Sequence, residues 1–263
     1  MGTLIGENPA DTRPLERFCH SVGRGINRFD MIRDGDRILL AVSGGKDSIA
    51  LSLALVARKR WVPIDYHLEA LQIEWKEYPY TEGEKAAVDA FFSRIGVPLK
   101  RVSATIHPPT FHKEFSCYQC ARNRKRILFD HAAEIGATKV AVGHHMDDIA
   151  ETTMINLFFR GEFSTMMPVQ EFFGGKLHII RPLCEVREAE VRRICRRLGL
   201  PSLPNKCPRA DKNQRVLMKE ILRMVSHVDK HAVSNIYGAP WRINREYLPT
   251  DLDGSSDALR GDQ

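Results

Sequence analysis

A short turn that combines glycines, a lysine and hydroxyl side chains stands near the start of the chain, directly after an apolar run. The run spans 37–42, and the turn reads Ser43-Gly44-Gly45-Lys46-Asp47-Ser48. Adjacent glycines let backbone N–H groups approach phosphate oxygens, and the N-terminus of a following helix adds positive potential. The string matches neither GxxxxGK[ST] nor GxGxxG. It indicates a phosphate-binding turn of another kind, against the simpler interpretation of a glycine-rich strand–helix connection.

Three of the six cysteines stand close to basic residues. Cys117 and Cys120 form a CxxC pair just before Arg122, and Cys207 lies in the loop 204–208. Cationic neighbours lower the pKa of a thiol and make it a better ligand or nucleophile. Zinc wants four nitrogen or sulfur ligands, whereas three cysteines leave one iron of a cubane cluster without a protein ligand. The residues alone leave zinc, an iron–sulfur cluster and a redox pair open.

The remaining cysteines and several apolar residues are expected to serve packing rather than chemistry. Six cysteines in a chain of 263 residues do not form a disulfide framework. Two aromatic residues, Trp75 and Tyr118, could stack on a base, although such residues near apolar runs usually belong to the core. The residues expected to pack are Cys19, Cys184, Cys195, Leu53, Ile127, Leu128 and Phe129.

Two adjacent carboxylates end a second motif, Gly143-His144-His145-Met146-Asp147-Asp148, which follows the short apolar strand 139–142. Carboxylates are favoured at the start of a helix, so Asp147 and Asp148 could be N-terminal caps. They also follow the carboxyl end of a strand, facing the turn at 43–48, where they could coordinate Mg²⁺ or act as a base. The residues alone leave both interpretations open.

Strands and helices alternate along most of the chain. Strands are expected at 37–42, 67–75, 99–106, 139–142 and 177–180, and helices at 15–29, 49–58, 121–135 and 147–159. A further helix begins at the capping box Thr81-xx-Glu84 and ends at Gly96. This alternation predicts an α/β fold with a parallel sheet, a doubly wound layer sandwich. From Arg187 to about Tyr237 only two or three basic helices are expected.

The predicted domains follow from this alternation. They are an N-terminal tail and helix at 1–30, a nucleotide-binding domain at 31–185, a basic helical extension at 186–240 and a C-terminal tail at 241–263. The first and last dozen residues are polar and poor in core formers.

Composition favours a protein that meets an anionic partner. Thirty-nine Lys and Arg against thirty-three Asp and Glu give a net charge of +6. Apolar runs stay far below the roughly 20 residues that span a bilayer, and the N-terminus lacks the layout of a secretion signal. We therefore expect a cytoplasmic protein without a membrane partner.

The string at 43–48 resembles the signature SGGxDS of the PP-loop ATP pyrophosphatase superfamily. The resemblance implies a Rossmann-like, adenine nucleotide alpha hydrolase-like fold. It also implies that ATP is cleaved between its α and β phosphates, so that a substrate oxygen is adenylated and pyrophosphate leaves. The turn would hold the pyrophosphate, with Asp47 near Mg²⁺ or the reacting phosphate. The residues implied to complete the ATP site are Ala41, Ile73 and Gly143.

Three longer segments resemble the tRNA 2-thiocytidine synthetase (TtcA) family. They are 25–48, 117–161, and IIRPL at 179–183 followed by LPNKCP at 203–208. The resemblance implies that Cys117, Cys120 and Cys207 ligate an oxygen-sensitive 4Fe–4S cluster. It also implies that the O2 of a tRNA pyrimidine, with cytidine in the anticodon loop favoured, is adenylated and replaced by sulfur. Asp47 would act electrostatically or bind metal, and Asp147 or Asp148 would be the base or a second metal ligand.

Basic residues near the proposed ligands are expected to contact tRNA phosphates. The residues predicted for this role are Arg122, Arg124, Lys125, Arg193 and Arg197, with Arg126, Arg192, Arg196, Lys206, Arg209, Lys212 and Arg215 nearby. A cysteine desulfurase or free sulfide would supply sulfur, and a homodimer is possible.

Two other functions fit the same residues. One is a PP-loop sulfur transferase or desulfidase that acts on tRNA uridine or on a small thio-compound. The other is an iron- or redox-sensing RNA-binding protein without catalysis.

Overall fold

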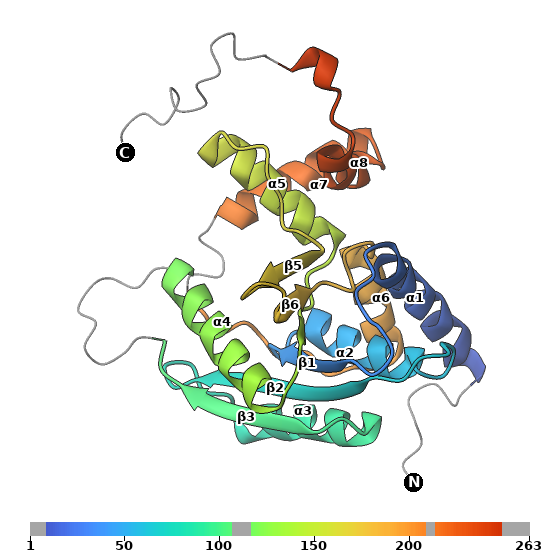
Figure 1. Cartoon of the computed structure of the whole chain (residues 1–263), viewed down its shortest axis with the longest axis vertical. Coiled ribbons are helices and arrows are strands. Elements are labelled where there is room, and N and C mark those ends of the chain that lie inside the picture. Colours follow the sequence, from blue (N-terminus) through green and yellow to red (C-terminus); the bar gives the residue numbers. More distant parts are fainter. Residues whose placement is uncertain (1–8, 107–116, 209–213, 249–263) are drawn as a thin grey trace.

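The structure is a computed structural model that describes residues 9–106, 117–208 and 214–248, so Arg209 and Lys212 lie outside the described residues. Its elements (Figure 1) are α1 (Pro9–Arg28), β1 (Arg37–Val42), α2 (Lys46–Arg58), β2 (His67–Trp75), α3 (Glu82–Ile95), β3 (Leu99–Ala104), α4 (Cys117–Glu134), β4 (Lys139–Ala141), α5 (Met146–Arg160), β5 (Val169–Phe172), β6 (Leu177–Ile180), α6 (Glu188–Arg197), α7 (Gln214–Val228), α8 (Ala232–Gly238) and the 3-10 helices η1 (Ala239–Trp241) and η2 (Arg245–Tyr247).

The six strands form one sheet in the order β3-β2-β1-β4-β6-β5. All neighbours are parallel except β5, which pairs antiparallel with β6, Val169 lying opposite Ile180. The prediction of a doubly wound α/β sheet is confirmed. The sheet has one antiparallel edge strand, β5, that the sequence did not indicate, because its four residues are too few and too polar to be recognised as a strand. The strand order reverses at β1, with β2 and β3 on one side of it and β4, β6 and β5 on the other. The carboxyl ends of β1 and β4 therefore lie side by side.

Alternate side chains of the strands pack on two different layers. On one face, Ile38 and Leu40 of β1 join a core made with α1, α2, α3 and α6. On the other face, Leu39 of β1 and Val140 of β4 pack against Leu128 and Ala132 of α4. This is the period-2 alternation of a strand buried on both sides. The packing roles predicted for Leu53, Ile127, Leu128 and Phe129 are confirmed, as is the burial of Cys19, Cys184 and Cys195.

The last helices are divided between two places. The helix α6 packs beside α1 and α2 through Val191 and Ile194, on the face of the sheet that Ile38 and Leu40 occupy. By contrast, α7 and α8 pack on α5 through Met218, Leu222 and Val233, and the three helices stand apart from the sheet (Figure 1). The segment predicted as one extension at 186–240 therefore contributes to two separate cores.

Several predicted element boundaries shift. The helix α4 begins at Cys117, one turn before the predicted start at Ala121, so both thiols of the CxxC pair are helical. The helix α2 begins at Lys46 rather than at Ile49. The strand β3 ends at Ala104, two residues early. Residues 9–12, predicted to belong to a frayed tail, lie in α1.

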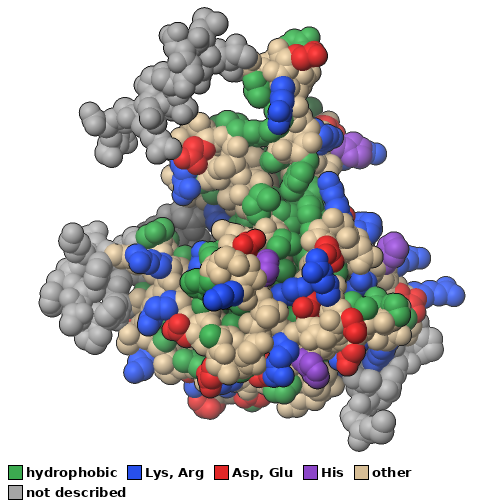
Figure 2. Space-filling view, viewed as in Figure 1, with side chains coloured by type: hydrophobic (Ala, Val, Ile, Leu, Met, Phe, Trp, Pro, Cys, Tyr) green, Lys and Arg blue, Asp and Glu red, His purple; other side chains and the backbone are tan. Residues whose placement is uncertain are grey.

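Large apolar side chains remain exposed on α5 and α7, and Figure 2 shows apolar side chains gathered between the sheet-bearing part and these helices. The exposed ones include Leu157, Phe158 and Phe159 on α5, and Met224 and Val228 on α7. Among the described residues, no helix is long and apolar enough to cross a membrane.

The start of α3 shows how a local signal fixes an element next to the site. Thr81 Oγ1 accepts a hydrogen bond of 3.2 Å from Glu84 N, and Thr81 N donates one of 2.7 Å to Glu84 Oε2. This reciprocal capping box confirms the prediction from Thr81-xx-Glu84. It satisfies two of the backbone donors that a helix start leaves without intrahelical partners.

Thr81→Ala removes the side-chain acceptor at the start of α3. We expect the free energy of unfolding to fall by about 1 kcal/mol, as measured by urea titration of the full chain. Thr81→Ser retains the hydroxyl and is the matched control. Equal losses in both variants would contradict the capping role.

Candidate nucleotide and thiol site

The turn at 43–48 joins β1 to α2 and is held by its own hydroxyls. Ser43 Oγ accepts from Gly45 N at 3.3 Å and lies 3.2 Å from Ser48 Oγ, which also donates to Gly45 O at 2.9 Å. Gly44 has φ +78°, which other residues rarely adopt. Among the described residues, no side chain caps the start of α2 at Gly45. The turn therefore presents a preformed, uncapped helix start, which suits a phosphate.

Lys46 and Asp47 of this turn belong to a charge network that reaches α6 and α7. Lys46 Nζ lies 3.0 Å from Asp47 Oδ2 and 3.1 Å from Glu188 Oε1. Burial lowers the pKa of Lys46, but the charges of Asp47 and Glu188 outweigh it and raise the pKa. Burial raises the pKa of Glu188, but hydrogen bonds from Lys219 and the charge of Lys46 outweigh it and lower the pKa to about 2. Both groups are therefore charged at neutral pH.

Asp47 carries one oxygen that is not satisfied. Its Oδ1 is buried and has no hydrogen-bond partner among the described residues. His145 Nε2 lies 3.8 Å from this oxygen. A buried carboxylate oxygen without a partner is costly, so this atom would gain from any ligand that offers it one.

The motif at 143–148 is packed directly against the turn. A Cβ on Gly143 would lie 2.9 Å from the backbone of Asp47 and of Ser48, so only glycine fits there. His145 and Asp148 form a capping box at the start of α5, with His145 N donating to Asp148 Oδ2 at 3.0 Å and Asp148 N to His145 Nδ1 at 3.3 Å. Since Nδ1 is the acceptor, the proton of the neutral ring lies on Nε2, the atom that faces Asp47.

Asp147 connects the start of α5 to the start of α6. Its Oδ2 accepts from Glu188 N at 2.8 Å, and its carboxylate lies 3.2 Å from Arg187 Nε. Asp148 lies 3.7 Å from Arg215 of α7. The two aspartates thus lie beside the turn, as their spacing predicts, and each also stabilises a helix start. The capping and the chemical interpretations share the same side chains.

The other histidine of this motif, His144, contacts a buried arginine. Arg181, which follows β6, donates to His144 Nδ1 at 3.3 Å and to Met167 O. Burial lowers the pKa of His144 to about 4, so the ring is neutral at pH 7. Burial also lowers the pKa of Arg181 to about 10. Arg181 therefore holds the ring of His144 in a single tautomer.

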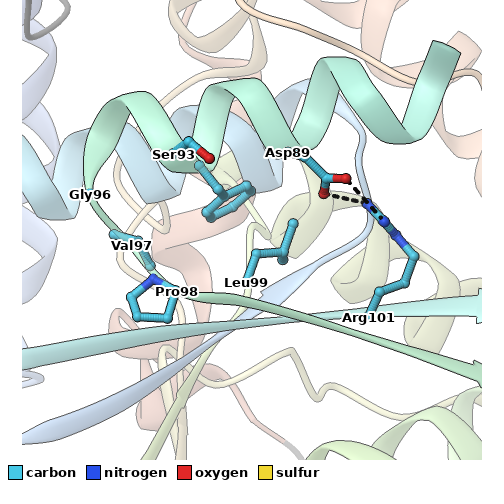
Figure 3. A pocket seen from close by; sticks show the side chains of 8 residues that line it. Asp89, Ser93, Gly96, Val97, Pro98, Leu99 and Arg101 are labelled. Carbon is cyan, nitrogen blue, oxygen red and sulfur yellow. Dashed lines mark hydrogen bonds and ion pairs between the residues drawn. The ribbon is translucent and has the colours of Figure 1, made fainter. Parts of the chain in front are cut away.

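Gln72, opposite Val42 in the register of β1 and β2, reaches the same edge from the neighbouring strand. Its buried Oε1 accepts from Arg101 Nε at 2.8 Å, and Arg101 is held by Asp89 at 2.8 Å. Figure 3 shows this ion pair beside a cavity of about 590 Å³ between α3 and the start of β3. The amide nitrogen of Gln72 is buried, has no partner among the described residues and lies beside Gly44.

The loop that carries Cys207, which we call the cysteine loop (residues 201–208), crosses the turn. Leu203 N donates to Gly44 O at 2.8 Å, and the Leu203 side chain covers Gly44. The turn is also contacted by Tyr80, whose Oη donates to Ser43 O at 3.1 Å. The phosphate-binding turn and the third cysteine are therefore parts of one assembly.

The three thiols predicted as ligands lie in one region. Cys117 and Cys120 are three residues apart on α4, hence on one helix face, and Cys207 is close enough to Cys120 to influence its titration. In the described part of the chain, however, no three His, Cys, Asp or Glu side chains are arranged to hold a metal ion. The donor set fits an iron–sulfur cluster in its chemistry, with three thiols and one open position.

Burial raises the pKa of Cys120, and the thiols of Cys207 and Cys117 add to the effect, while Arg124 opposes it. The expectation that basic neighbours lower the thiol pKa is wrong for Cys120, because burial outweighs the one guanidinium. Arg124 lies 3.9 Å from the sulfur and stacks over Trp75. Tyr118, between the two cysteines, is 72% exposed and is not a core residue.

The basic residues predicted to bind tRNA are not brought together. Arg122, Arg124 and Lys125 are exposed on α4, on one side of the sheet. Arg193 and Arg197 are exposed on α6, on the other side, beside α1. Two other predicted ATP-site residues, Ala41 and Ile73, pack on the α4 side of the sheet, and Ile73 is buried.

Several residues of the site carry no signal in the sequence that we used. Gln72, Tyr80, Arg181, Arg187, Glu188 and Leu203 all contact the turn or the motif at 143–148 only through tertiary folding. Arg181 and Leu203 lie in strings that resemble the thiolation family, IIRPL and LPNKCP, which is the signal that could have found them.

These features define a nucleotide-binding α/β protein with a strand–turn–helix phosphate site. A family model described as a PP-loop domain matches residues 16–222. Proteins named tRNA-cytidine(32) 2-sulfurtransferase are similar over most of the chain. The one from Alkalilimnicola ehrlichii is 30% identical over 238 residues, covering 89% of this chain and 75% of its own. The one from Delftia acidovorans is 35% identical over 213 residues, covering 79% and 67%.

The chain therefore belongs to the PP-loop family and, within it, to the group of relatives that bear this sulfurtransferase name. Among solved structures, the U34-tRNA thiolase NcsA from Methanococcus maripaludis matches with a TM-score of 0.69 at 20% identity, covering 90% of this chain and 82% of that one. This match confirms the fold.

Glu151 of α5 provides a test of the charge network. Burial raises its pKa from 4.5 to about 7, and the charge of Asp148 adds to this. The folded state therefore binds this proton more tightly than the unfolded state, and folding loses stability as pH rises from 4.5 to about 7. Glu151→Gln should stabilise the protein by on the order of 3 kcal/mol at pH 8 and by much less at pH 5.

Urea titrations of both proteins at the two pH values measure this difference. Glu220→Gln, an acid-to-amide change on the exposed side of α7, is the control and should show no such pH dependence. A gain from Glu151→Gln that is equal at pH 5 and pH 8 would contradict the raised pKa.

Proposed function

We propose that the chain is an ATP-dependent tRNA sulfurtransferase that replaces the O2 of cytidine 32 with sulfur. The single observation that carries this is the joining of the uncapped turn at 43–48 to the cysteine loop through Leu203 N and Gly44 O. The relatives named tRNA-cytidine(32) 2-sulfurtransferase support the substrate and the position. A protein that only bound RNA would have no need to join a phosphate site to a thiol site.

Activation of the substrate is assigned to the turn. The backbone of the turn and the start of α2 would bind the departing pyrophosphate, and Lys46 would exchange Asp47 and Glu188 for phosphate oxygens. Adenylation of the cytidine O2 forms an O–P bond to the α phosphate and breaks the bond to the β phosphate. It converts a poor leaving oxygen into AMP.

Asp47 is proposed to bind Mg²⁺ through its unpartnered Oδ1. A carboxylate oxygen is a ligand that Mg²⁺ prefers, and the buried atom gains a partner by binding it. His145 Nε2–H, at 3.8 Å, orients that carboxylate. Asp147 and Asp148 remain proposed as a second metal ligand or a base, with a helix-capping role at all stages.

Cys117, Cys120 and Cys207 are proposed to hold a 4Fe–4S cluster, which the thiolase from Methanococcus maripaludis contains on the same fold. When bound, such a cluster supplies an iron without a protein ligand, where sulfide can be held. Cys117 and Cys120 are three residues apart on α4, so one face of this helix presents both thiols.

The tRNA surface is proposed to lie on α4. Arg122 and Lys125 are exposed there, within two turns of the CxxC pair, and Arg124 is anchored over Trp75 at the end of β2. The exposed ring of Tyr118 is a stacking surface for an unpaired base. A cytidine in a single-stranded loop can be unstacked to expose its O2 at modest cost.

Two further parts of the function stay predictions. The sulfur source is a cysteine desulfurase or free sulfide, and the protein may be tested for a homodimer by sedimentation. The four predicted domains, and activity in the cytoplasm, likewise rest on the sequence.

Complementation tests the reaction. In a host that lacks its own enzyme of this kind, wild type should restore 2-thiocytidine in tRNA, measured by mass spectrometry of nucleosides. Asp47→Asn should lower it by about 100-fold or more, since charge stabilisation in such sites is worth several kcal/mol. Cys207→Ala should abolish it, and Cys19→Ala, a buried thiol away from the site, should restore it.

Restoration of a thiouridine instead of 2-thiocytidine would show that the substrate is wrong. If no thionucleoside changes while ATP–pyrophosphate exchange proceeds without tRNA, the function is that of a small-molecule sulfur transferase.

Salt dependence of tRNA binding tests the surface on α4. The double variant Arg122→Gln, Lys125→Gln should reduce the slope of log Kd against log salt by about 1.5, because each lost phosphate contact is worth about 0.7 to 0.9. Fluorescence anisotropy with labelled tRNA gives the slope. Arg193→Gln with Arg197→Gln, on the opposite side of the sheet, is the matched comparison. A slope that changes only in the comparison variant would move the surface to α6.

A further inference from the structure

The residue before the third cysteine is fixed at three points, although it lies in an otherwise irregular loop. Lys206 Nζ donates to Pro79 O at 2.9 Å and to Glu84 Oε2 at 2.6 Å. The same ammonium lies 5.5 Å from the centre of the Tyr80 ring. The Lys206 side chain is 27% exposed and that of Glu84 is 19% exposed, so the pair is partly shielded from water.

The anchor for Lys206 is itself rigid. Glu84 Oε2 also accepts from Thr81 N in the capping box at the start of α3. Tyr80 N donates to Glu74 Oε1 at 2.9 Å, and Tyr80 Oη donates to Ser43 O of the phosphate-binding turn. Lys206 is therefore attached to a helix start, to the end of β2 and, through Tyr80, to the turn at 43–48.

The cysteine loop is attached to the rest of the protein at two residues, Leu203 and Lys206. Leu203 N binds Gly44 O at one end, and Lys206 binds the start of α3 at the other. Around Lys206, Cys207 N donates to Asn205 Oδ1 at 3.1 Å, which bends the loop locally. Among the described residues, the contacts that tie this part of the loop to the rest of the protein are made by Lys206, the neighbour of Cys207.

We propose that Lys206 is a positioning residue for Cys207, and that its ion pair with Glu84 holds the third thiol where a cluster can be completed. This inference rests on the proposed function, in which Cys207 is a cluster ligand. Residues that orient a metal ligand without touching the metal typically change metal retention by 10- to 100-fold when they are replaced.

The experiment compares proteins reconstituted with iron and sulfide without oxygen. Cluster loss to a chelator is followed by visible absorption, together with iron and acid-labile sulfide per chain. Lys206→Met should lose its cluster about 10-fold faster than wild type, and Glu84→Gln should also lose it faster, since glutamine keeps the capping box but not the ion pair. Lys206→Arg should retain it. Lys85→Met is the matched control. It removes a lysine of α3, the helix of Glu84, that pairs with Glu74 of β2 and Glu82 of α3.

A second measurement reports on the loop without the cluster. In the cluster-free proteins, alkylation of Cys207 by iodoacetamide is followed by peptide mass spectrometry. Lys206→Met should speed the reaction at Cys207 and leave Cys117 unchanged, because only the cysteine loop is released. Unfolding by urea identifies any variant that is simply unstable.

The outcomes separate this inference from the proposed function. If Cys207→Ala retains the cluster as well as wild type does, the ligand assignment fails. If Cys207→Ala loses the cluster but Lys206→Met behaves as Lys85→Met in both measurements, the positioning role fails and the ligand assignment stands. Faster cluster loss and faster alkylation of Cys207 in Lys206→Met, with Lys85→Met unchanged in both, support the positioning role.

Discussion

Three helices begin at one place on the carboxyl edge of the sheet, and the positive potential at their starts governs the site. The first residue of α2, Lys46, is paired with the first residue of α6, Glu188, whose backbone N–H is bound by Asp147 near the start of α5. Each helix start has backbone donors that need acceptors. In the free protein, carboxylates meet much of this need, and a polyphosphate offers the same kind of oxygen at higher charge.

This arrangement explains why so many acidic residues lie in a site for an anion. Asp47, Asp147, Asp148 and Glu188 are each matched to a cation or a helix start, so their charges are already balanced. A nucleotide that enters with a divalent cation brings both signs and can exchange partners without leaving a buried charge alone. Asp47 Oδ1 is buried and has no hydrogen-bond partner among the described residues, so it can accept a new partner without losing an old one.

The sequence predicted most of the frame because its signals are local. The apolar run 37–42, the capping box at Thr81 and the glycine at 96 fix elements through contacts within a few residues, and the structure has them where expected. The antiparallel strand β5 was missed. It has only four residues, two of them polar, and such a short run does not show the alternation by which a strand is recognised. The CxxC pair was placed before its helix, since the apolar spacing that marks this helix in the sequence begins only after Cys120.

The site was only partly predictable for the same reason. The turn and the motif at 143–148 are contiguous strings, so their residues could be named. Arg187, Glu188 and Leu203 reach the turn from far along the chain, and their partners depend on how α6 packs under the sheet. The two basic groups looked alike in sequence, but the sheet separates α4 from α6.

The hydrogen bond between Leu203 N and Gly44 O closes one of the longest loops in the chain. During synthesis, the strand and helix around Gly44 leave the ribosome long before the cysteine loop does, and N-terminal parts generally fold first. The phosphate-binding turn is therefore made early, but Leu203, which covers Gly44, is synthesised much later. A nascent chain in which the cysteine loop has not yet been made has a turn without its cover, and Cys117 and Cys120 without the third thiol, so the site becomes a single unit only after Cys207 has been synthesised.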